Sequence, residues 1–459
     1  MRRRNNGSDK SVKNARSIKR NGRRKPSQTP NSAAPSESTQ TAGSSNNNAQ
    51  NGGPGNGKRD PGDQWGLYLA QALKCYHADV PIDEIEYLLK EPGDYLFRRA
   101  EVNGKFEYFI CVRHSNGIVH ALMNRTSDGV FFIKKHTFNR PEDLLHFHIG
   151  NNLPVDDVSA YIKRPIEQQS HYLNAENIEV KQKIGEGAFG EVYEAVMRRI
   201  DGSFIKVACK NLKGFATKAD RDEFMKEFRF MNQFEHENIV KIYGVTLHST
   251  PILMVLEMCY GGSLKSYLKR NPLPYKHLIK YCTDAARGLC YLSTRDVIHR
   301  DIAARNCLLG GNDEVKISDF GLSVISKEPV KAGKNQKIAI RWCAPETIST
   351  GFFQMKTDVW AYGILMWEIF NHCHNDPFPG KTNAEVKTII TAGDKPLDLP
   401  NDVPSNVLKC YSYCLYKEAS YRPNFIEILK FLSSREEPPI PEEMKKAMGV
   451  KTCKMNVKK

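Results

Sequence analysis

The chain has 459 residues and a formal net charge of +15, a length that accommodates two or three domains, each with its own core. No apolar run is long enough to cross a bilayer: the most hydrophobic one, 359–370, is short and contains Glu368. The amino terminus lacks a signal-peptide core and a glycine for myristoylation, and the twelve cysteines show neither a C-x-x-C pair nor zinc spacing. These features exclude membrane-spanning and disulfide-framed secreted classes and predict a reduced, cytoplasmic or nuclear compartment.

Residues 1–64 form a basic, low-complexity tail. Between Met1 and Lys25 there are eleven Lys and Arg residues against one acid, Asp9, and polar residues dominate positions 26–64. We expect disorder, because so few apolar residues cannot offset the ordering entropy.

The basic block is either a solvated tail or a contact for an acidic partner. An anionic membrane surface, at the inner face of the plasma membrane, is the favoured partner, at about 1 kcal/mol per basic residue. RNA, DNA or a nuclear import receptor would bind the same basic residues. Sequence-specific nucleic-acid binding is not expected, because no base-reading module accompanies them.

Residues 75–163 have the pattern of a compact domain with helices at 82–90 and 141–149. Between the helices, alternation along a strand puts Arg98 on the inward face with Leu96. The domain resembles an SH2 domain in Tyr76-His77-Ala78, Gly93-Asp94-Tyr95-Leu96-Phe97-Arg98 and Val119-His120. The resemblance implies an antiparallel sheet between two helices that binds phosphotyrosine peptides. Arg98 would form the floor of the phosphate pocket, because a guanidinium binds a phosphate through two hydrogen bonds, and His120 would form a wall.

Two positions depart from the SH2 pattern. Ala100 stands where the family has a serine donor, and Ile82 stands where an arginine often covers the ring. Each missing charge-assisted hydrogen bond is worth about 1.5 to 3 kcal/mol, so a weaker or differently tuned pocket is expected. The alternative is a domain kept only for packing. A polar linker, 164–177, comes next and is short enough that the second domain should touch the first.

Residues 178–435 begin with a glycine-rich turn between two predicted strands, 178–184 and 191–196. Its pattern, G-x-G-x-x-G-x-V, lets backbone approach phosphate oxygens. Val207-Ala208-Cys209-Lys210 is predicted as a third strand, in which Ala208 and Lys210 share a face. A helical run, 218–233, contains Glu227 as the candidate ion-pair partner of Lys210.

The run His299-Arg300-Asp301-Ile302-Ala303-Ala304-Arg305-Asn306 carries the strongest signal. It places a carboxylate, Asp301, five residues before an amide ligand, Asn306, as phosphoryl transfer requires. Three further motifs come later in the chain, in the order Asp319-Phe320-Gly321, Ala344-Pro345-Glu346 and Asp358-Val359-Trp360. Arg422 is the expected partner of Glu346.

Together these motifs resemble those of a bilobal protein kinase. Serine/threonine kinases usually have a lysine two residues after the catalytic Asp, whereas this sequence has Ala303 there and its first cation at Arg305. That arrangement resembles the one in tyrosine kinases. The resemblance implies ATP with Mg²⁺ or Mn²⁺. Asp301, Arg305, Lys210 and Glu227 would be catalytic, and Asn306 and Asp319 would hold the metal. The nucleotide would lie against Ile184, Gly185, Gly187, Gly190, Val192, Ala208, Lys210 and the backbone of Glu257 and Cys259, with Leu256 as gatekeeper.

The activation segment, 319–346, contains no tyrosine. The position at which the family has its phosphorylated tyrosine is Val330, and Ala339 stands where a proline commonly supports the substrate ring. The cations of the segment oppose rather than replace a phosphate; they are Lys327, Lys331, Lys334, Lys337 and Arg341. We therefore hypothesise that SH2 docking or a partner, rather than loop autophosphorylation, sets the activity.

The order of SH2 domain and kinase domain resembles the Fes/Fer group of non-receptor tyrosine kinases. That resemblance covers residues 76–432 and implies that the SH2 domain supports the active kinase near the Glu227 helix. The group's long amino-terminal membrane-bending region is not in the sequence. The alternative function is a phosphotyrosine-binding scaffold with a silent kinase domain, but Lys210, Asp301, Asn306 and Asp319 are all present. Residues 436–459 are predicted to be a basic, disordered tail.

Overall fold

A computed structural model describes residues 66–438 except for 67, 70, 71, 78, 79, 104, 127–129, 134, 135, 157, 158, 187–189, 200, 213–216, 248–250, 334, 335, 337, 394–396, 401 and 435–437. The predictions for the two basic tails therefore lie outside the described residues, Pro438 excepted. The described residues belong to one compact unit, 54–459. Within this described part, no helix has both the length and the apolar character needed to span a membrane.

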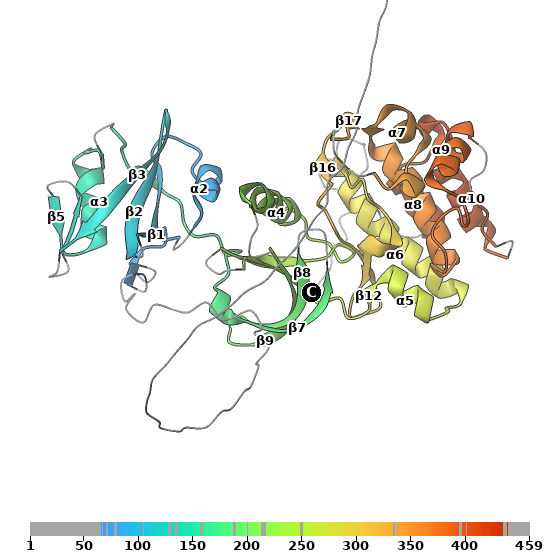
Figure 1. Cartoon of the computed structure of the whole chain (residues 1–459), viewed down its shortest axis with the longest axis horizontal. Helices are drawn as coiled ribbons and strands as arrows, with labels where there is room; N and C mark the ends of the chain where they lie inside the picture. The colour runs from blue at the N-terminus through green and yellow to red at the C-terminus, as the bar shows by residue number, and fades with distance from the viewer. Residues whose placement is uncertain are drawn as a thin grey trace, which may run out of the picture. The chain divides into compact units, whose positions relative to one another are not determined.

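The first domain is a sheet of six strands in the order β5-β4-β3-β2-β1-β6, with helices α2 and α3 (Figure 1). Its elements are α2 (Ile82–Leu88), β1 (Asp94–Val102), β2 (Lys105–His114), β3 (Gly117–Arg125), β4 (Phe131–Ile133), β5 (His136–Phe138), α3 (Pro141–Gly150) and β6 (Arg164–Pro165). Strands β1 to β5 pair antiparallel, and alternate residues of β1, such as Tyr95 and Phe97, pack into one core with Ile110. The predicted SH2 architecture is therefore present.

The linker, 164–177, is more than the polar spacer that the sequence predicts. Its first residues form β6, which pairs parallel with β1, and Arg164 binds the buried Asp94 through two hydrogen bonds of 2.7 and 2.9 Å. Near its other end, Tyr172 bridges to Val245 of the next sheet. Backbone hydrogen bonds at both ends explain why so short a polar segment is ordered.

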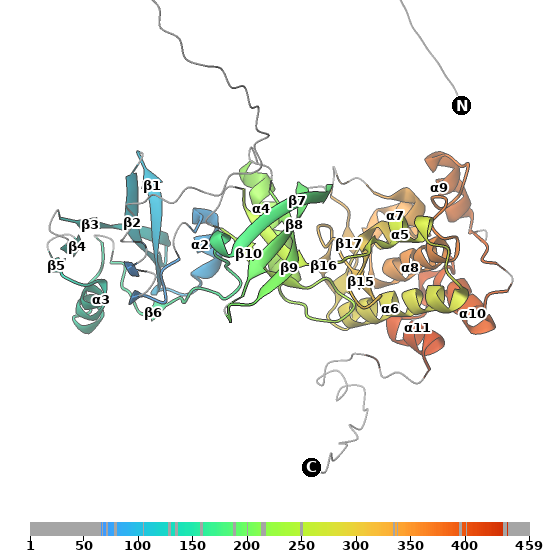
Figure 2. The same ribbon diagram turned by 90° about the horizontal axis from the view of Figure 1, so that it is seen from below.

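The second domain starts with a five-stranded antiparallel sheet in the order β10-β11-β9-β8-β7, whose neighbouring strands are visible in Figure 2. Its elements are η1 (Ala175–Asn177), β7 (Ile178–Glu186), β8 (Glu191–Arg198), β9 (Phe204–Asn211), α4 (Lys218–Met231), β10 (Ile242–Thr246) and β11 (Leu253–Glu257). Helix α4 begins where Thr217 and Asp220 form a capping box, and it buries Phe224 and Phe228. This sheet and helix form the first, smaller lobe of the predicted bilobal kinase fold.

The large lobe is mainly helical. Its helices are α5 (Leu264–Arg270), α6 (Tyr275–Ser293), α7 (Pro345–Thr350), α8 (Met355–Phe370), α9 (Asn383–Ala392), α10 (Ser405–Cys414) and α11 (Phe425–Leu432). Short strands and turns complete it: β12 (Gly262–Ser263), β13 (Val297–Ile298), η2 (Ala304–Asn306), β14 (Cys307–Leu309), β15 (Val315–Ile317), β16 (Val324–Ile325), β17 (Val330–Lys331), η3 (Ile340–Trp342), β18 (Phe352–Phe353) and η4 (Ala419–Tyr421).

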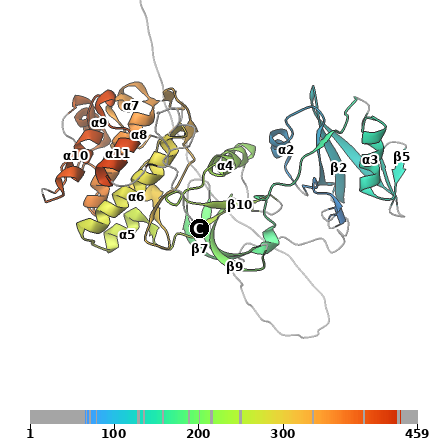
Figure 3. The ribbon, with the colours of Figure 1, turned by 180° about the vertical axis from the view of Figure 1, so that it is seen from behind.

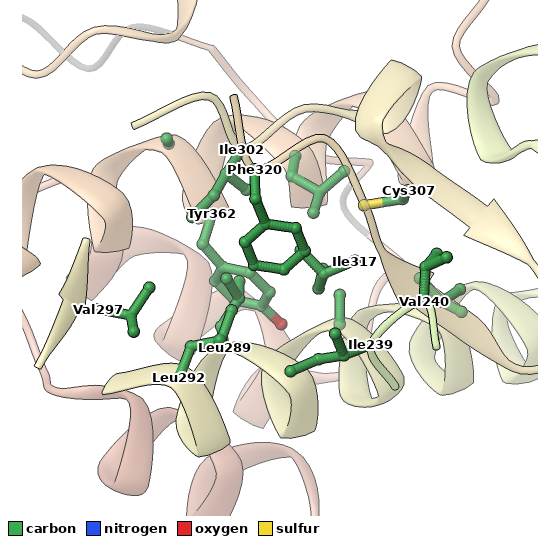
Figure 4. Packing of buried hydrophobic residues seen from close by; sticks show 14 of the residues in the cluster. Ile239, Val240, Leu289, Leu292, Val297, Ile302, Cys307, Ile317, Phe320 and Tyr362 are labelled. Carbon is green, nitrogen blue, oxygen red and sulfur yellow. The ribbon is translucent and has the colours of Figure 1, made fainter. Parts of the chain in front are cut away.

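Helix α8 lies at the centre of this lobe and packs against α6 and α10 (Figure 3). All its residues from Thr357 to Phe370 are buried, including two carboxylates, Asp358 and Glu368. Because a buried charge is costly unless it is bonded, these two acids must have fixed partners. Figure 4 shows part of the hydrophobic core of this lobe, in which Phe320 packs near Ile302 and Tyr362.

The two domains touch, as the short linker predicts. Glu84 of α2 accepts hydrogen bonds from Arg229 of α4 (2.7 Å) and from Tyr172 of the linker (2.8 Å). The Glu84 side chain is only 3% exposed, so this is a desolvated ion pair rather than a surface contact.

Candidate active site

The glycine-rich turn joins β7 to β8, and Val192 pairs across the sheet with Lys210. A Cβ at Gly190 would lie 2.0 Å from the carbonyl oxygen of Asn211, so no side chain fits there. The side chain of Asn211 also accepts the N–H of Glu191 at 2.6 Å. Gly185 lies in β7, whereas Gly187, another predicted nucleotide contact, is outside the described residues.

The predicted ion pair between Lys210 and Glu227 is present. Lys210 Nζ lies 2.8 and 2.7 Å from the two carboxylate oxygens of Glu227, and the side chains are only 12% and 3% exposed. Burial raises the pKa of the Glu227 carboxyl and the Lys210 ammonium opposes this shift. The pair joins β9 to α4 and so fixes Lys210 beside the glycine-rich turn.

Both carboxylate oxygens of Asp301 are occupied by side chains of the same loop. Oδ1 accepts from the Arg305 guanidinium, and Oδ2 accepts from Asn306 Nδ2 at 2.7 Å. Asn306 Nδ2 also donates to the Asp301 carbonyl oxygen at 2.8 Å. The carboxylate is thereby held in one orientation beside a fixed cation.

The neighbouring His299 contacts the backbone of this loop. It is buried, its Nε2 lies 3.2 Å from the Ser318 carbonyl oxygen, and its Nδ1 lies 3.3 Å from the Asp301 backbone nitrogen. Desolvation lowers the pKa of His299, so the ring is neutral. A neutral ring that donates from Nε2 and accepts at Nδ1 satisfies both contacts.

Two buried acids of α8 hold the same loop. Asp358 accepts the backbone N–H groups of His299 (2.6 Å) and Arg300 (3.0 Å), and Arg300 has a left-handed backbone with φ +71°. Glu368 accepts the N–H of Ala304 and the indole N–H of Trp342, each at 2.9 Å. Sequence reasoning missed the role of both acids. The one signal that could have found them is a carboxylate inside an apolar helix.

The residues proposed for metal binding have suitable oxygen donors. Asn306 uses its amide nitrogen for Asp301, which leaves the amide oxygen for a cation. Asp319 follows Ser318, whose N–H and hydroxyl both donate to the Asn306 carbonyl oxygen at 2.9 Å, so the two segments are tied together. A carboxylate and an amide oxygen are ligands that Mg²⁺ prefers, so the donor set fits.

The predicted adenine contacts lie on adjacent strands. Leu256 of β11 pairs with Ala208 of β9, and the Glu257 N–H donates to the Lys241 carbonyl oxygen at 2.9 Å. The Glu257 side chain is fixed by the Lys241 N–H at 2.9 Å and by Lys316 at 3.0 Å. The next positions, including Cys259, are partly buried.

A cavity of about 320 Å³ lies beside the Asp301 carboxylate. Its lining includes Arg305, Gln336, Ala339 and Trp342, and the Arg305 guanidinium lies 4.4 Å from the centre of the Trp342 ring. The smaller Ala339, in place of a proline, forms part of the wall. The cavity therefore opens between Asp301 and the activation segment.

The phosphotyrosine-pocket candidates also lie close together. Arg98 is 8% exposed and donates from Nη1 to the Val80 carbonyl oxygen at 3.0 Å, while its Nε has no partner among the described atoms. His120 lies 3.1 Å from the Cys111 thiol, and partial burial, followed by the charge of Arg98, lowers the pKa of His120. Ile82 is 52% exposed and supplies no cation.

Comparison with known proteins agrees with this geometry. The family model described as protein tyrosine and serine/threonine kinase matches residues 178–432, and the SH2 domain model matches 75–148. The Caenorhabditis elegans protein named Fer-related kinase 1 is 37% identical over 336 residues, 72% of this chain and 85% of the relative. The chain belongs to the Fer and Fps group of SH2-containing tyrosine kinases.

Two other members of the group are similar over the same domains. Human tyrosine-protein kinase Fer is 32% identical over 368 residues, which is 78% of this chain and 43% of Fer. The transforming protein Fps of avian sarcoma virus (strain PRCII) is 32% identical over 355 residues, 76% of this chain and 65% of Fps. The predicted fold class, SH2 domain before kinase domain, is confirmed. The matched region therefore covers less than half the length of Fer.

Proposed function

We propose that this kinase transfers the γ-phosphoryl group of ATP to protein tyrosine through the loop 299–306. Bound ATP, with Mg²⁺ or Mn²⁺ on Asn306 and Asp319, supplies the electrophilic phosphoryl group. The observation that carries the proposal is the Asp301 carboxylate, which Arg305 and Asn306 hold beside an open cavity. Asp301 accepts the proton of the tyrosine hydroxyl, Lys210 orients the phosphates, and Glu227 orients Lys210.

An assay with mixed tyrosine and serine peptides tests this proposal. The wild type should form phosphotyrosine only, and Asp301→Asn should lose transfer while its melting temperature stays close to that of the wild type. Asn cannot accept the phenolic proton, although it can still bond Arg305 or Asn306 through its oxygen. Phosphoserine formation, or full activity in the variant, would contradict the proposal.

We also propose that the SH2 domain binds phosphotyrosine through Arg98 and His120. Arg98 has the spare buried donor that a phosphate needs, whereas Ala100 and Ile82 add none. Arg98→Lys keeps the charge but loses the bidentate geometry, so calorimetry should show at least about tenfold weaker binding of a phosphotyrosine peptide. An unchanged affinity would leave only the packing role.

The basic tail, in this proposal, brings the kinase to anionic membrane surfaces at the cytoplasmic face. It is supported by the charge of residues 1–25 alone. Sedimentation with phosphatidylserine vesicles should fall steeply with salt and be lost when the basic residues of 1–25 are neutralised. Preferential binding to RNA over the vesicles would refute this part.

A further inference from the structure

The activation segment of this kinase is attached to the large lobe although it contains no tyrosine. Its strand β17 pairs antiparallel with β18, with Val330 opposite Phe353 and Lys331 opposite Phe352. The pairing continues as Ala332 donates its N–H to the Gly351 carbonyl oxygen at 2.9 Å. Val330, the position expected for the family's phosphorylated tyrosine, is therefore a residue of this short ladder.

Beyond β17, one side chain attaches the segment to the catalytic loop, residues 299–306. The amide oxygen of Gln336 accepts a hydrogen bond of 2.5 Å from Arg300 Nη2 and another of 3.1 Å from the Gly333 N–H. The Gln336 N–H in turn donates to the Gly333 carbonyl oxygen at 3.0 Å. Gln336 thus closes its own turn and fastens that turn to Arg300.

Arg300 is well placed to transmit this contact to the reacting group. Its N–H is bound by Asp358, its guanidinium lies 4.7 Å from the centre of the Phe353 ring, and its Nε is buried without a partner among the described atoms. Arg300 immediately precedes Asp301, and both line the 320 Å³ cavity together with Gln336. A displacement of Gln336 would therefore remove part of the wall of this cavity.

We infer that Gln336 is a positioning residue that anchors the activation segment to Arg300. This contact would assemble the cavity beside Asp301, where the substrate tyrosine is proposed to bind, without a phosphate on the segment. A cationic donor and a neutral amide oxygen form a charge-assisted hydrogen bond. The β17–β18 ladder and the ring of Phe353 hold the rest of the segment. Since a phosphorylated residue orders such segments by pairing with an arginine, the amide here occupies the partner that a phosphate would require.

The inference rests on the proposed tyrosine kinase activity, and two matched substitutions test it. Gln336→Leu keeps the approximate size and removes the acceptor, whereas Gln336→Glu keeps an acceptor for Arg300. Gln168→Leu, at an exposed linker position, is the control. We expect kcat/KM for a tyrosine peptide to fall about tenfold or more in Gln336→Leu, with the KM for ATP unchanged, because the loss is of one charge-assisted bond. The kcat/KM of Gln336→Glu should lie much closer to that of the wild type than to that of Gln336→Leu.

A second measurement separates positioning from folding. Amide hydrogen exchange at 330–336 should become faster in Gln336→Leu, while exchange in α6 and α8 and the melting temperature should match those of the wild type. The wild type, treated with a phosphatase that removes phosphate from tyrosine, serine and threonine, should keep its rate. Mass spectrometry of 319–346 should find no phosphate on the active enzyme.

The results that overturn the inference differ from those that overturn the proposed function. Wild-type protein that phosphorylates no tyrosine peptide contradicts the function itself. An active wild type with an equally active Gln336→Leu contradicts only the inference, as does an activity that phosphatase abolishes or that depends on phosphate at Ser323 or Ser326. If Gln336→Leu unfolds, Gln336→Glu decides the matter, because a folded Gln336→Glu variant with less than about a tenth of the control rate also contradicts the inference.

Discussion

Single carboxylates inside the large lobe set the shape of the catalytic loop. Asp358 uses one oxygen for the N–H of His299 and the other for the N–H of Arg300. Burial raises the pKa of the Asp358 carboxyl to about 7, and the two N–H donors oppose that shift. The loop therefore depends on an acceptor pair that only a carboxylate provides in this geometry.

Asp358→Asn should lower both stability and activity. The amide nitrogen of Asn would face one of the two backbone N–H groups, so a buried donor would lose its acceptor at a cost of about 1 to 3 kcal/mol. Denaturant unfolding and a peptide assay would measure the two effects. Asp222→Asn, at an exposed position on α4, serves as the control. Equal unfolding free energies for Asp358→Asn and the control would show that the two bonds contribute nothing.

At the scale of elements, the decisive contact is that of α2 with α4. Glu84 holds Arg229 and Tyr172, and the Arg229 guanidinium lies 4.6 Å from the centre of the exposed Tyr87 ring. Helix α4 also carries Glu227, the partner of Lys210. The SH2 domain is thus attached to the same helix that orients Lys210, for which we propose phosphate binding.

A double-mutant cycle with Glu84→Gln and Arg229→Gln measures this contact. Because the pair is desolvated, we expect a coupling energy of about 1 to 3 kcal/mol between the two side chains. Each single variant should lose peptide kinase activity, and the double variant should lose less than the sum of the two single losses. The exposed pair Lys241 and Glu235 is the control, with no measurable coupling expected. Additive effects at Glu84 and Arg229 would argue against docking as a support for α4.

For the molecule as a whole, buried neutral histidines make stability depend on pH. His77 is 1% exposed, donates from Nε2 to the Ile166 carbonyl oxygen at 2.8 Å, and has no partner for Nδ1 among the described atoms. Desolvation lowers the pKa of His77 below its ordinary 6.5, and burial also lowers those of His171 and His299. Asp358, with its raised pKa, titrates in the opposite sense.

Unfolding free energies at about pH 7.5 and 5.5 test the histidine contribution. Below pH 6.5 His77 becomes protonated in the unfolded chain but stays neutral in the folded chain, because its pKa is lowered there. The unfolded state then binds more protons, so the free energy of unfolding decreases as the pH is lowered. In His77→Gln that difference disappears, so the stability lost between the two pH values should be smaller than in the wild type. His146→Gln, at an exposed position of α3, is the control and should lose as much stability as the wild type. An equal loss in His77→Gln would mean that His77 titrates alike in both states.

Local chemistry was enough to predict the fold of the two domains and several contacts of the candidate site from sequence. Three features depend only on spacing along one strand or loop, so the sequence alone is enough to recognise them: the glycine-rich turn, the run 299–306 and the inward Arg98. The predicted pairs Lys210 with Glu227 and Glu346 with Arg422 are present, the latter at 2.6 and 2.8 Å. The linker prediction was incomplete, because pairing of Arg164 and Tyr172 with two different sheets has no local signature.

By itself, then, the sequence determined the two domains, their order and the residue types of the chemistry, because these depend on periodicity and motif spacing. Only the tertiary structure decided which polar groups meet across long separations: Asp358 with the loop at 299–300, Glu84 with Arg229, and Gln336 with Arg300. These partners are 36 to 145 residues apart. Such contacts depend on how whole elements pack, and a carboxylate or amide in isolation does not indicate which donor will reach it.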